Sequence, residues 1–533
     1  MSRIVPAEIL RIYKIVHSWV GILAGLALFI AFYAGALTVF KEPLSHWTAA
    51  GQPIPTTAFD QAETLIARTL AERADARHTF TLHLGRTSDP SVYLSWHQDQ
   101  DARSQWTATL DGEGALSVTE RGAKDIGDLV DHIHRTAGLP GGLEFGSLVM
   151  GIVSALYVIA LVSGFIVWLP SARKDLLALR LERNPKRAWL DGHNVVGIAS
   201  LPFHLAIALT AVVFGLHDSI YASLDRTVYG GQVRPILQAA NPYTVVAPDA
   251  RPADMLPPAD LLARVRAFAP GFEPTAIQYR NPGTEGAMAV ILGEDPRHLV
   301  RAHGFLVSSP VSGAILNTDY LPGRQGTWGA IVAAFFALHF GTFGGEPVRW
   351  SYFLLALAGA FLFYSGNWLW IESRRRAHAR DGASGPTRSL RAMEALTTGG
   401  ILGCIGGLSV AIALGKLLHG HVTHPQPWLW TAYYLCFLGA IAWAWRRGAE
   451  QAARPLLLLC AVATLAIPWA SWQASDLELG QSLLARHGGA MPGVDWIALC
   501  GAFALLWLAW RHFKQSARPD PMATSQNAPP HSG

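Results

Sequence analysis

The chain has 533 residues, of which 51% are hydrophobic and only 15% charged, and its formal net charge is +4. This apolar excess predicts a membrane protein, and the small net charge gives no basis for nucleic-acid binding. The four cysteines all lie in apolar runs near the C-terminus, so neither a disulfide framework nor a zinc site is indicated.

Long apolar runs predict an α-helical integral membrane protein with about eight transmembrane helices. Each run approaches the ~20 apolar residues that cross a bilayer, and the first lacks a cleavage motif, so we expect it to be retained. The runs cover residues 16–40, 146–169, 195–217, 350–371, 395–418, 428–446, 455–473 and 494–512.

Basic residues set the expected orientation. Lys and Arg cluster near the start of the chain and after the second, fourth, sixth and eighth runs. The positive-inside rule then places both termini in the cytoplasm. Under this topology the short apolar segment 326–341 lies at the outer interface, as does the more polar segment 126–138.

Two long segments between the runs face outward, and each predicts a small α+β module. The first has a predicted helix at 58–73 and strands at 79–84, 92–97 and 106–110. The second has a predicted helix at 258–267 and strands at 276–279, 287–292 and 299–306. The expected order is span 1 (10–40), module 1 (41–130), an interfacial segment with span 2 (131–170), a basic loop (171–192), span 3 (193–217), module 2 (218–325), an interfacial helix with span 4 (326–376), four added spans (393–513) and a disordered cytoplasmic tail (516–533).

An internal repeat relates the two halves of the first 375 residues or so. His17-x-x-x-Gly21 opens the first span, and His193-x-x-x-Gly197 opens the third. His134 precedes the second span and His339 the fourth, and both of these spans end in Ser-Gly followed by Trp. The repeat predicts a four-helix core with histidines in two layers.

Paired imidazoles in a membrane core are typical ligands of electron-transferring haem. We therefore interpret His17, His134, His193 and His339 as axial ligands of the iron of two b-type haems. The layers favour the pairs His17–His193 and His134–His339. His204, eleven residues after His193, is a further candidate cofactor ligand. Two interpretations stay open: it replaces one histidine of the outer pair as a ligand, or it is a polar residue that forms hydrogen bonds within the bundle. Catalytic residues are not indicated.

Several motifs are missing from the sequence. There is no CxxCH for covalent haem attachment, no Walker loop, and no GxGxxG after a predicted strand. An electron donor is therefore expected to be a separate protein, a small reductant or a quinol.

These motifs in this order resemble the PepSY-associated transmembrane family, also called iron-regulated membrane proteins. The resemblance covers about residues 10–376 and includes Asp191-Gly-His193-Asn-x-x-Gly197, Pro202-Phe-His204 and His339-Phe-Gly341. It implies a bacterial inner-membrane protein with two periplasmic PepSY-like modules, similar to di-haem reductases that release iron from ferric siderophores.

The first interpretation is therefore a di-haem b oxidoreductase that reduces a periplasmic ferric siderophore or other Fe(III) chelate. Two alternatives stay open. One is a haem-free permease or accessory protein for iron or siderophore uptake. The other is a periplasmic binding or sensory protein that uses its PepSY modules.

Overall fold

The structure is a computed structural model, and it forms two compact units. It describes residues 6–49, 55–85, 90–97, 104–122, 125–172, 180, 185–239, 241–301, 303–380, 386–474 and 493–516. The first unit comprises residues 1–42, 52–366 and 419–426, and the second comprises 43–51, 367–418 and 427–533. The predicted tail after Ser516 and most of the loop 173–184 lie outside the described residues.

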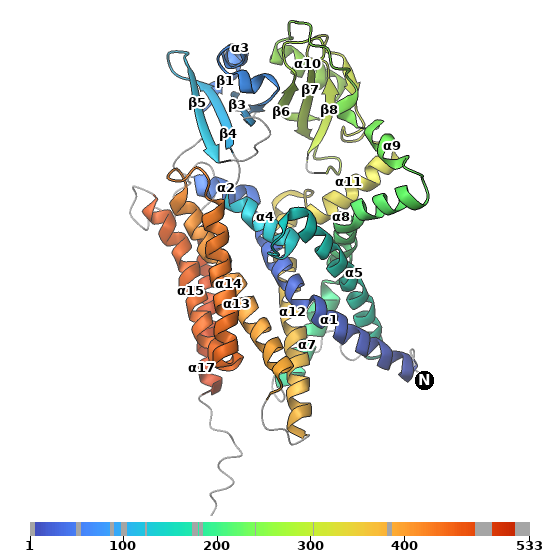
Figure 1. Cartoon of the computed structure of the whole chain (residues 1–533), viewed down its shortest axis with the longest axis vertical. Helices are drawn as coiled ribbons and strands as arrows, with labels where there is room; N and C mark the ends of the chain where they lie inside the picture. Colours follow the sequence, from blue (N-terminus) through green and yellow to red (C-terminus); the bar gives the residue numbers. More distant parts are fainter. Residues whose placement is uncertain are drawn as a thin grey trace, which may run out of the picture. The chain divides into compact units, whose positions relative to one another are not determined.

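Long apolar helices form the helical part of the first unit (Figure 1). Glycines permit close packing, since a Cβ at Gly151 of one helix would meet Gly215 and Leu216 of another. These helices are α1 (Ala7–Thr38), α5 (Gly142–Trp168), α8 (Leu201–Thr227) and α12 (Gly345–Arg380), of which α12 continues into the second unit.

The third predicted span is broken rather than continuous. Helix α7 (Pro185–Ala199) ends before Ser200, and α8 starts at Leu201 with Pro202 in its first turn. Proline is favoured in a first turn because no backbone donor is needed there. His193 therefore lies on α7 and His204 on α8, and the backbone hydrogen bonds from Ser200 to Val196 and from His204 to Ser200, both 3.0 Å, lie on either side of the junction.

Shorter helices lie between the long ones. Helix α4 (Ile126–Thr136) begins with a reciprocal capping box between Asp125 and Asp128, which fixes its first turn. Helix α11 (Thr327–Phe340) ends at Gly341, whose φ of 63° favours glycine. Helix α9 (Val233–Ala239) follows α8.

The two modules share one antiparallel sheet, although the sequence predicted each module separately. Strand β2 of the first module pairs with β6 of the second, with Leu82 opposite Ile277. The order is β5-β4-β3-β2-β6-β7-β8-β9, and β1 pairs with β3. The strands are β1 (Thr57–Ala58), β2 (Thr79–Leu84), β3 (Ser91–His97), β4 (Ser104–Leu110), β5 (Leu116–Gly122), β6 (Glu273–Arg280), β7 (Met288–Glu294), β8 (Gly304–Ser308) and β9 (Ile315–Asn317).

Most predicted strands match the structure. The strand expected at 299–306 is wrong over its first part, because β8 starts only at Gly304. Strands β5 and β9 were not expected. Each lies at one end of the sheet, where the strand has a hydrogen-bonded neighbour strand on one side only and its apolar alternation is weak.

One face of the shared sheet is covered by helices α3 (Ala62–Glu72) and α10 (Pro258–Phe268), one from each module. Leu65 and Leu261 of these helices belong to the same apolar core as Phe80, Leu82 and Ile277 of the sheet. Alternation along the strands turns the intervening residues to the opposite face.

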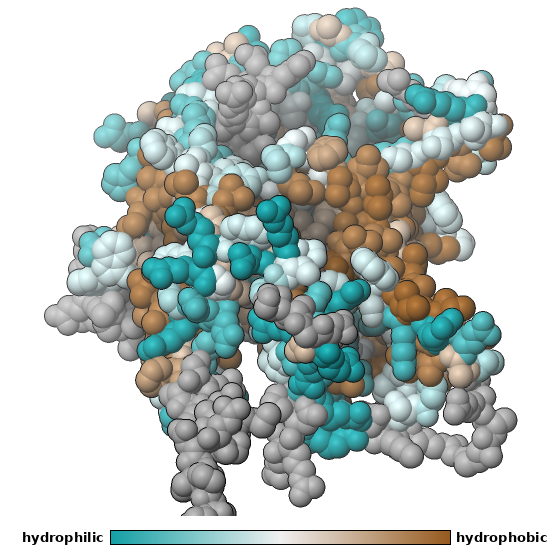
Figure 2. Space-filling view, turned by 60° about the horizontal axis from the view of Figure 1, so that its bottom comes forward, coloured by the Kyte–Doolittle hydropathy of each residue, from teal (hydrophilic) through white to brown (hydrophobic). Residues whose placement is uncertain are grey.

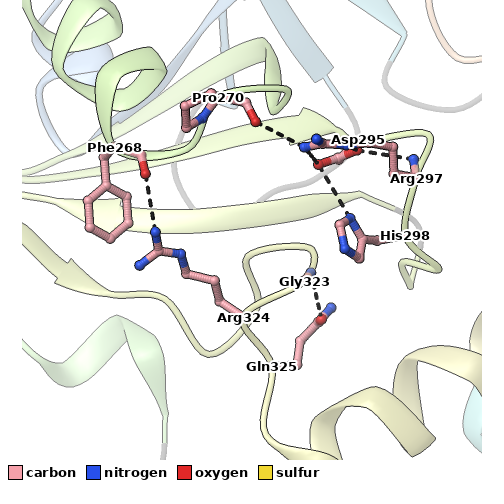
Figure 3. A network of polar contacts seen from close by, with 8 residues as sticks. All are labelled: Phe268, Pro270, Asp295, Arg297, His298, Gly323, Arg324 and Gln325. Atoms are coloured by element: carbon pink, nitrogen blue, oxygen red, sulfur yellow. Dashed lines mark hydrogen bonds and ion pairs between the residues drawn. The ribbon is translucent and has the colours of Figure 1, made fainter.

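A polar network fixes the loop after β7 (Figure 3). Arg297 donates two hydrogen bonds to the buried carboxylate of Asp295, at 2.9 and 2.7 Å, and a third to the carbonyl of Pro270 at 2.9 Å. His298 lies 3.4 Å from the same carboxylate. Hydrogen bonding by Arg297 is the main reason that the pKa of Asp295 falls from 3.8 to about 2.

The second unit contains four long helices and the short helix α2 (Lys41–Ala49), which starts in the first unit. Its core includes Ala395, Ala440, Leu456 and Leu505. The long helices are α13 (Arg388–Leu418), α14 (Gln426–Arg447), α15 (Ala449–Gln473) and α17 (Gly493–Ser516).

Each predicted span except the third falls on one helix, the third is divided between α7 and α8, and the described residues contain seven helices long and apolar enough to cross a membrane. Helix α14 is the predicted span outside that group. Large apolar side chains remain exposed on the helices, for example Ile152 and Val213, and Figure 2 shows the hydrophobic surface to which such residues contribute. Such a surface is expected where lipid replaces water.

Candidate functional site

The first histidine pair joins the two halves of the repeat. His17 on α1 and His193 on α7 have ring centroids 6.3 Å apart, with the rings inclined at 74°. Nδ1 of His17 lies 2.9 Å from the carbonyl of Ala160 on α5. Nδ1 of His193 lies 2.9 Å from Oγ of Ser365 on α12.

The second pair has the same design on two shorter helices. His134 near the end of α4 and His339 near the end of α11 have ring centroids 6.1 Å apart, inclined at 43°. Nδ1 of His134 lies 2.8 Å from the carbonyl of Ala31 on α1. Nδ1 of His339 lies 2.8 Å from Oγ1 of Thr210 on α8.

These contacts assign the tautomer of all four rings. A backbone carbonyl only accepts hydrogen bonds, so His17 and His134 must donate from Nδ1. The hydroxyl of Thr210 donates to Ala206 at 2.7 Å, and that of Ser365 donates to Leu362 at 3.1 Å, which leaves each oxygen to accept from its histidine. The proton therefore lies on Nδ1, and Nε2 carries the lone pair.

This arrangement fits a metal held between two imidazoles. Metal-bound histidines commonly donate their second ring N–H to a carbonyl or another acceptor, which fixes the ring. A metal–nitrogen bond of about 2 Å places each ring centre roughly 3 Å from the metal, so two opposed rings are about 6 Å apart. Both observed separations agree with this value. None of the four Nε2 atoms makes a hydrogen bond within the described part of the chain.

The exposure of the four histidines and the charge of two of them agree with a role as metal ligands. All four rings are half-buried. His134 and His339 lie on helices that are not among the candidate spans, and desolvation by burial lowers the pKa of both side chains. Both imidazoles are therefore neutral near pH 7, the form that binds a metal.

Glycines make room for the rings. A Cβ at Gly164 would lie 2.8 Å from Cε1 of His17, and one at Gly35 would lie 2.9 Å from Nδ1 of His134. Gly21, four residues after His17, has nothing within 4 Å of its Cβ position.

His204 lies apart from both pairs. Its side chain is fully buried, and neither ring nitrogen has a hydrogen-bond partner in the described residues. It packs against Phe32, Phe203 and Tyr157, with ring centroids 5.6, 5.4 and 6.1 Å away. The structure brings four of the five candidate histidines together in pairs and leaves His204 in an aromatic environment.

A buried carboxylate in the middle of α7 lies close to the first histidine pair in sequence. Asp191 is 1% exposed and accepts hydrogen bonds from Arg180 at 2.9 and 3.1 Å. Nε of Arg187 lies 3.1 Å from Oδ1 of the same carboxylate. Because Asp191 precedes His193 by two residues, this ion cluster is anchored on the same helix as His193.

The comparisons with known proteins agree with this architecture. The model of the PepSY-associated TM region matches residues 15–373, more than half of the chain. An uncharacterized protein of Pseudomonas aeruginosa is 25% identical over 425 residues, which cover 74% of this chain and 96% of that protein. The chain is a membrane protein that belongs to the PepSY-associated TM family.

Proposed function

We propose that the chain is an oxidoreductase that holds two b-type haems and passes electrons across the bacterial inner membrane to an Fe(III) chelate. His17 and His193 hold one haem, and His134 and His339 hold the other. The observation that carries this proposal is the common tautomer of four histidines whose ring separations suit a shared metal. A bound haem supplies a reversible one-electron carrier.

The proposed topology has eight spans, with both termini in the cytoplasm and the two PepSY-like modules in the periplasm. It rests on the basic residues that follow alternate spans. The His17–His193 pair then lies on the cytoplasmic side and the His134–His339 pair on the periplasmic side. Electrons enter from a separate reductase, a small reductant or a quinol.

The acceptor is an Fe(III) chelate such as a ferric siderophore. One electron converts Fe(III) into Fe(II), which oxygen ligands hold less tightly, so the iron is released. The chain's own part is to hold the four imidazoles and to keep Nε2 of each available. Ser365, Thr210 and the carbonyls of Ala31 and Ala160 do this by accepting from Nδ1.

The test is an anaerobic reoxidation experiment. The full-length protein in detergent is reduced with dithionite, freed of excess reductant, and mixed with ferric citrate or with gallium(III) citrate. Loss of the reduced haem bands with ferric citrate alone, matched by Fe(II) trapped with a colorimetric chelator, is the expected result. Reduced bands that persist with ferric citrate would contradict the proposal.

The two alternative functions predict a protein without bound haem. A haem-free permease or accessory protein for iron uptake, and a binding or sensory protein built on the PepSY modules, would each be colourless after purification. For both, alanine at His17 and His193 would leave function unchanged.

A further inference from the structure

Helix α11, which carries His339, is held by few buried side chains. Along its described length only Ala333 and Ala337 are buried, and alanine removes little apolar area from water. Helix α4, which carries His134, differs in this respect. Its apolar side chains that are at most 1% exposed are Ile126, Leu129, Val130 and Ile133. The position of α11 therefore depends more on the contacts that its exposed and half-buried residues make.

One of these contacts comes from the second module. Arg301 lies in the loop between β7 and β8, and its Cζ atom is 4.1 Å from the ring centroid of Phe336 on α11 and 5.7 Å from that of Tyr320. A guanidinium within about 6 Å of an aromatic face is attracted to the ring. The hydroxyl of Thr342, just after α11, donates to the carbonyl of Arg301 at 3.4 Å. Side chain and backbone of Arg301 thus both contact the segment that carries His339.

Tyr320 is itself fixed within the module. Its ring stacks on that of Phe305 of β8, with centroids 4.6 Å apart and planes inclined at 9°. The backbone N–H of Phe305 also donates to the carbonyl of Tyr320 at 3.1 Å. Phe305 stacks in turn on Tyr243 at 6.0 Å, and Arg280 of β6 lies over the Tyr243 ring at 4.2 Å. A row of rings and guanidinium groups therefore connects the sheet to Arg301 and α11.

The contact on Phe336 reaches the histidine pair through one helical turn. Phe336 and His339 are three residues apart, so their side chains lie on the same side of α11. Both contact Phe214 of α8, whose ring centroid is 4.7 Å from that of Phe336 and 5.0 Å from that of His339. Since Thr210 on the same helix α8 accepts from Nδ1 of His339, a shift of α11 would turn the imidazole relative to His134.

We propose that Arg301 is a positioning residue for the second histidine pair, through which the second module sets the orientation of the His339 ring. Arg301 acts through Phe336 and does not contact the ligand itself. The part that concerns bound haem rests on the proposed function, whereas the contact between the module and α11 rests on the structure alone. The second module then supports one ligand of the site.

The first measurement is hydrogen–deuterium exchange of the full-length protein in detergent. Arg301→Gln is expected to speed exchange of the α11 amides about two- to fivefold, because it removes the cation–π contact. Arg301→Lys keeps a cation and is expected to restore part of the protection. Arg324→Gln is the matched control, because it removes a guanidinium 4.2 Å from the ring of Phe268 on α10 (Figure 3) and leaves α11 untouched. Unchanged exchange in α11 of the Arg301→Gln variant would overturn the proposal.

A second variant covers the case in which Arg301→Gln fails to fold. Phe336→Leu removes the ring under the guanidinium, and it is also expected to speed exchange in α11. In the combined variant the two effects are expected to be less than multiplicative, since both changes remove the same contact. Fully multiplicative effects would contradict a role of Arg301 through Phe336.

The second measurement is the electron paramagnetic resonance spectrum of the oxidised protein. The low-spin signal of a haem with two imidazole ligands depends on the orientation of the two rings, so each histidine pair is expected to give its own signal. Arg301→Gln is expected to shift the signal that His134→Ala removes and to leave the other signal unchanged. Arg301→Lys is expected to return the shifted signal toward its original position. A general loss of stability would instead disturb both signals.

These outcomes separate the role of Arg301 from the redox function. Two unchanged signals together with faster exchange in α11 would contradict the positioning of His339 and leave the redox function intact. A colourless protein with faster exchange in α11 of the Arg301→Gln variant would contradict the redox function and support the contact by which the module positions α11.

Discussion

His17 and His193 have ring centroids 6.3 Å apart with their planes inclined at 74°, and each donates its Nδ1 hydrogen to a neighbouring helix of its own half of the repeat. The acceptors are Ala160 on α5 and Ser365 on α12. Two halves of one chain thus build each side of a two-imidazole site in the same way. The predictions below test this arrangement.

The pairing predicts haem content in double variants. His17→Ala combined with His193→Ala is expected to leave one haem per chain, because both changes affect the same site. His17→Ala combined with His339→Ala is expected to leave none. A pyridine haemochrome assay measures both, and equal haem content in the two double variants would contradict the pairing.

The groups that accept hydrogen bonds from Nδ1 of the histidines are expected to strengthen haem binding without being ligands themselves. Thr210→Val removes the oxygen that orients His339, and loss of such a partner typically weakens metal binding about 10–100-fold. Thr210→Ser keeps the hydroxyl and is expected to restore haem retention. Haem loss during dialysis against apomyoglobin measures the effect; identical retention in the valine and serine variants would argue against this role.

The glycine contacts predict a steric effect. Gly164→Ala would place a Cβ 2.8 Å from Cε1 of His17, so the ring must move and haem content is expected to fall. Gly197→Ala is the matched control, because its Cβ would make only an ordinary contact of 3.6 Å with Leu362. The prediction fails if the two alanine variants retain the same amount of haem.

His204→Leu is expected to keep both haems. The substitution removes two buried ring nitrogens without partners, whose desolvation costs about 1–3 kcal/mol each in general. Thermal unfolding is therefore expected at the same or a higher temperature. Loss of one haem would instead identify His204 as a ligand.

Arg297→Gln is expected to make the chain more sensitive to acid. The folded-state pKa of Asp295, about 2, lies below its ordinary value of 3.8. The ion pair therefore stabilises the fold above this ordinary value and is lost as the pH falls toward 2. The variant should unfold at a higher pH in an acid titration followed by tryptophan fluorescence, with Arg266→Gln as control. Coincident titration curves would contradict the assignment.

Sequence reasoning predicted the elements that repeat or have strong patterns. The spans follow from apolar length, and the four paired histidines from their equivalent positions in two halves. Pro202 signals the break before α8, but the apolar run across it suggested one helix.

Contacts between distant elements could not be predicted in the same way. Periodicity shows which face of a helix is apolar but not which residue of a neighbour it meets, so Thr210 and Ala31 were missed as partners of the second pair. Ser163 and Ser365 were visible as motif residues, yet only the fold shows that both lie at Nδ1 of a histidine. The pairing of β2 with β6 has no local signal, because each strand has the same pattern whichever neighbour it has.

The most direct test of the central claim is the haem content of the purified, unaltered protein from haem-replete cells. Optical spectra of the oxidised and dithionite-reduced forms, with a pyridine haemochrome assay, give the type of haem and the number per chain. The expected result is b-type spectra and two haems per chain. A colourless protein would contradict it.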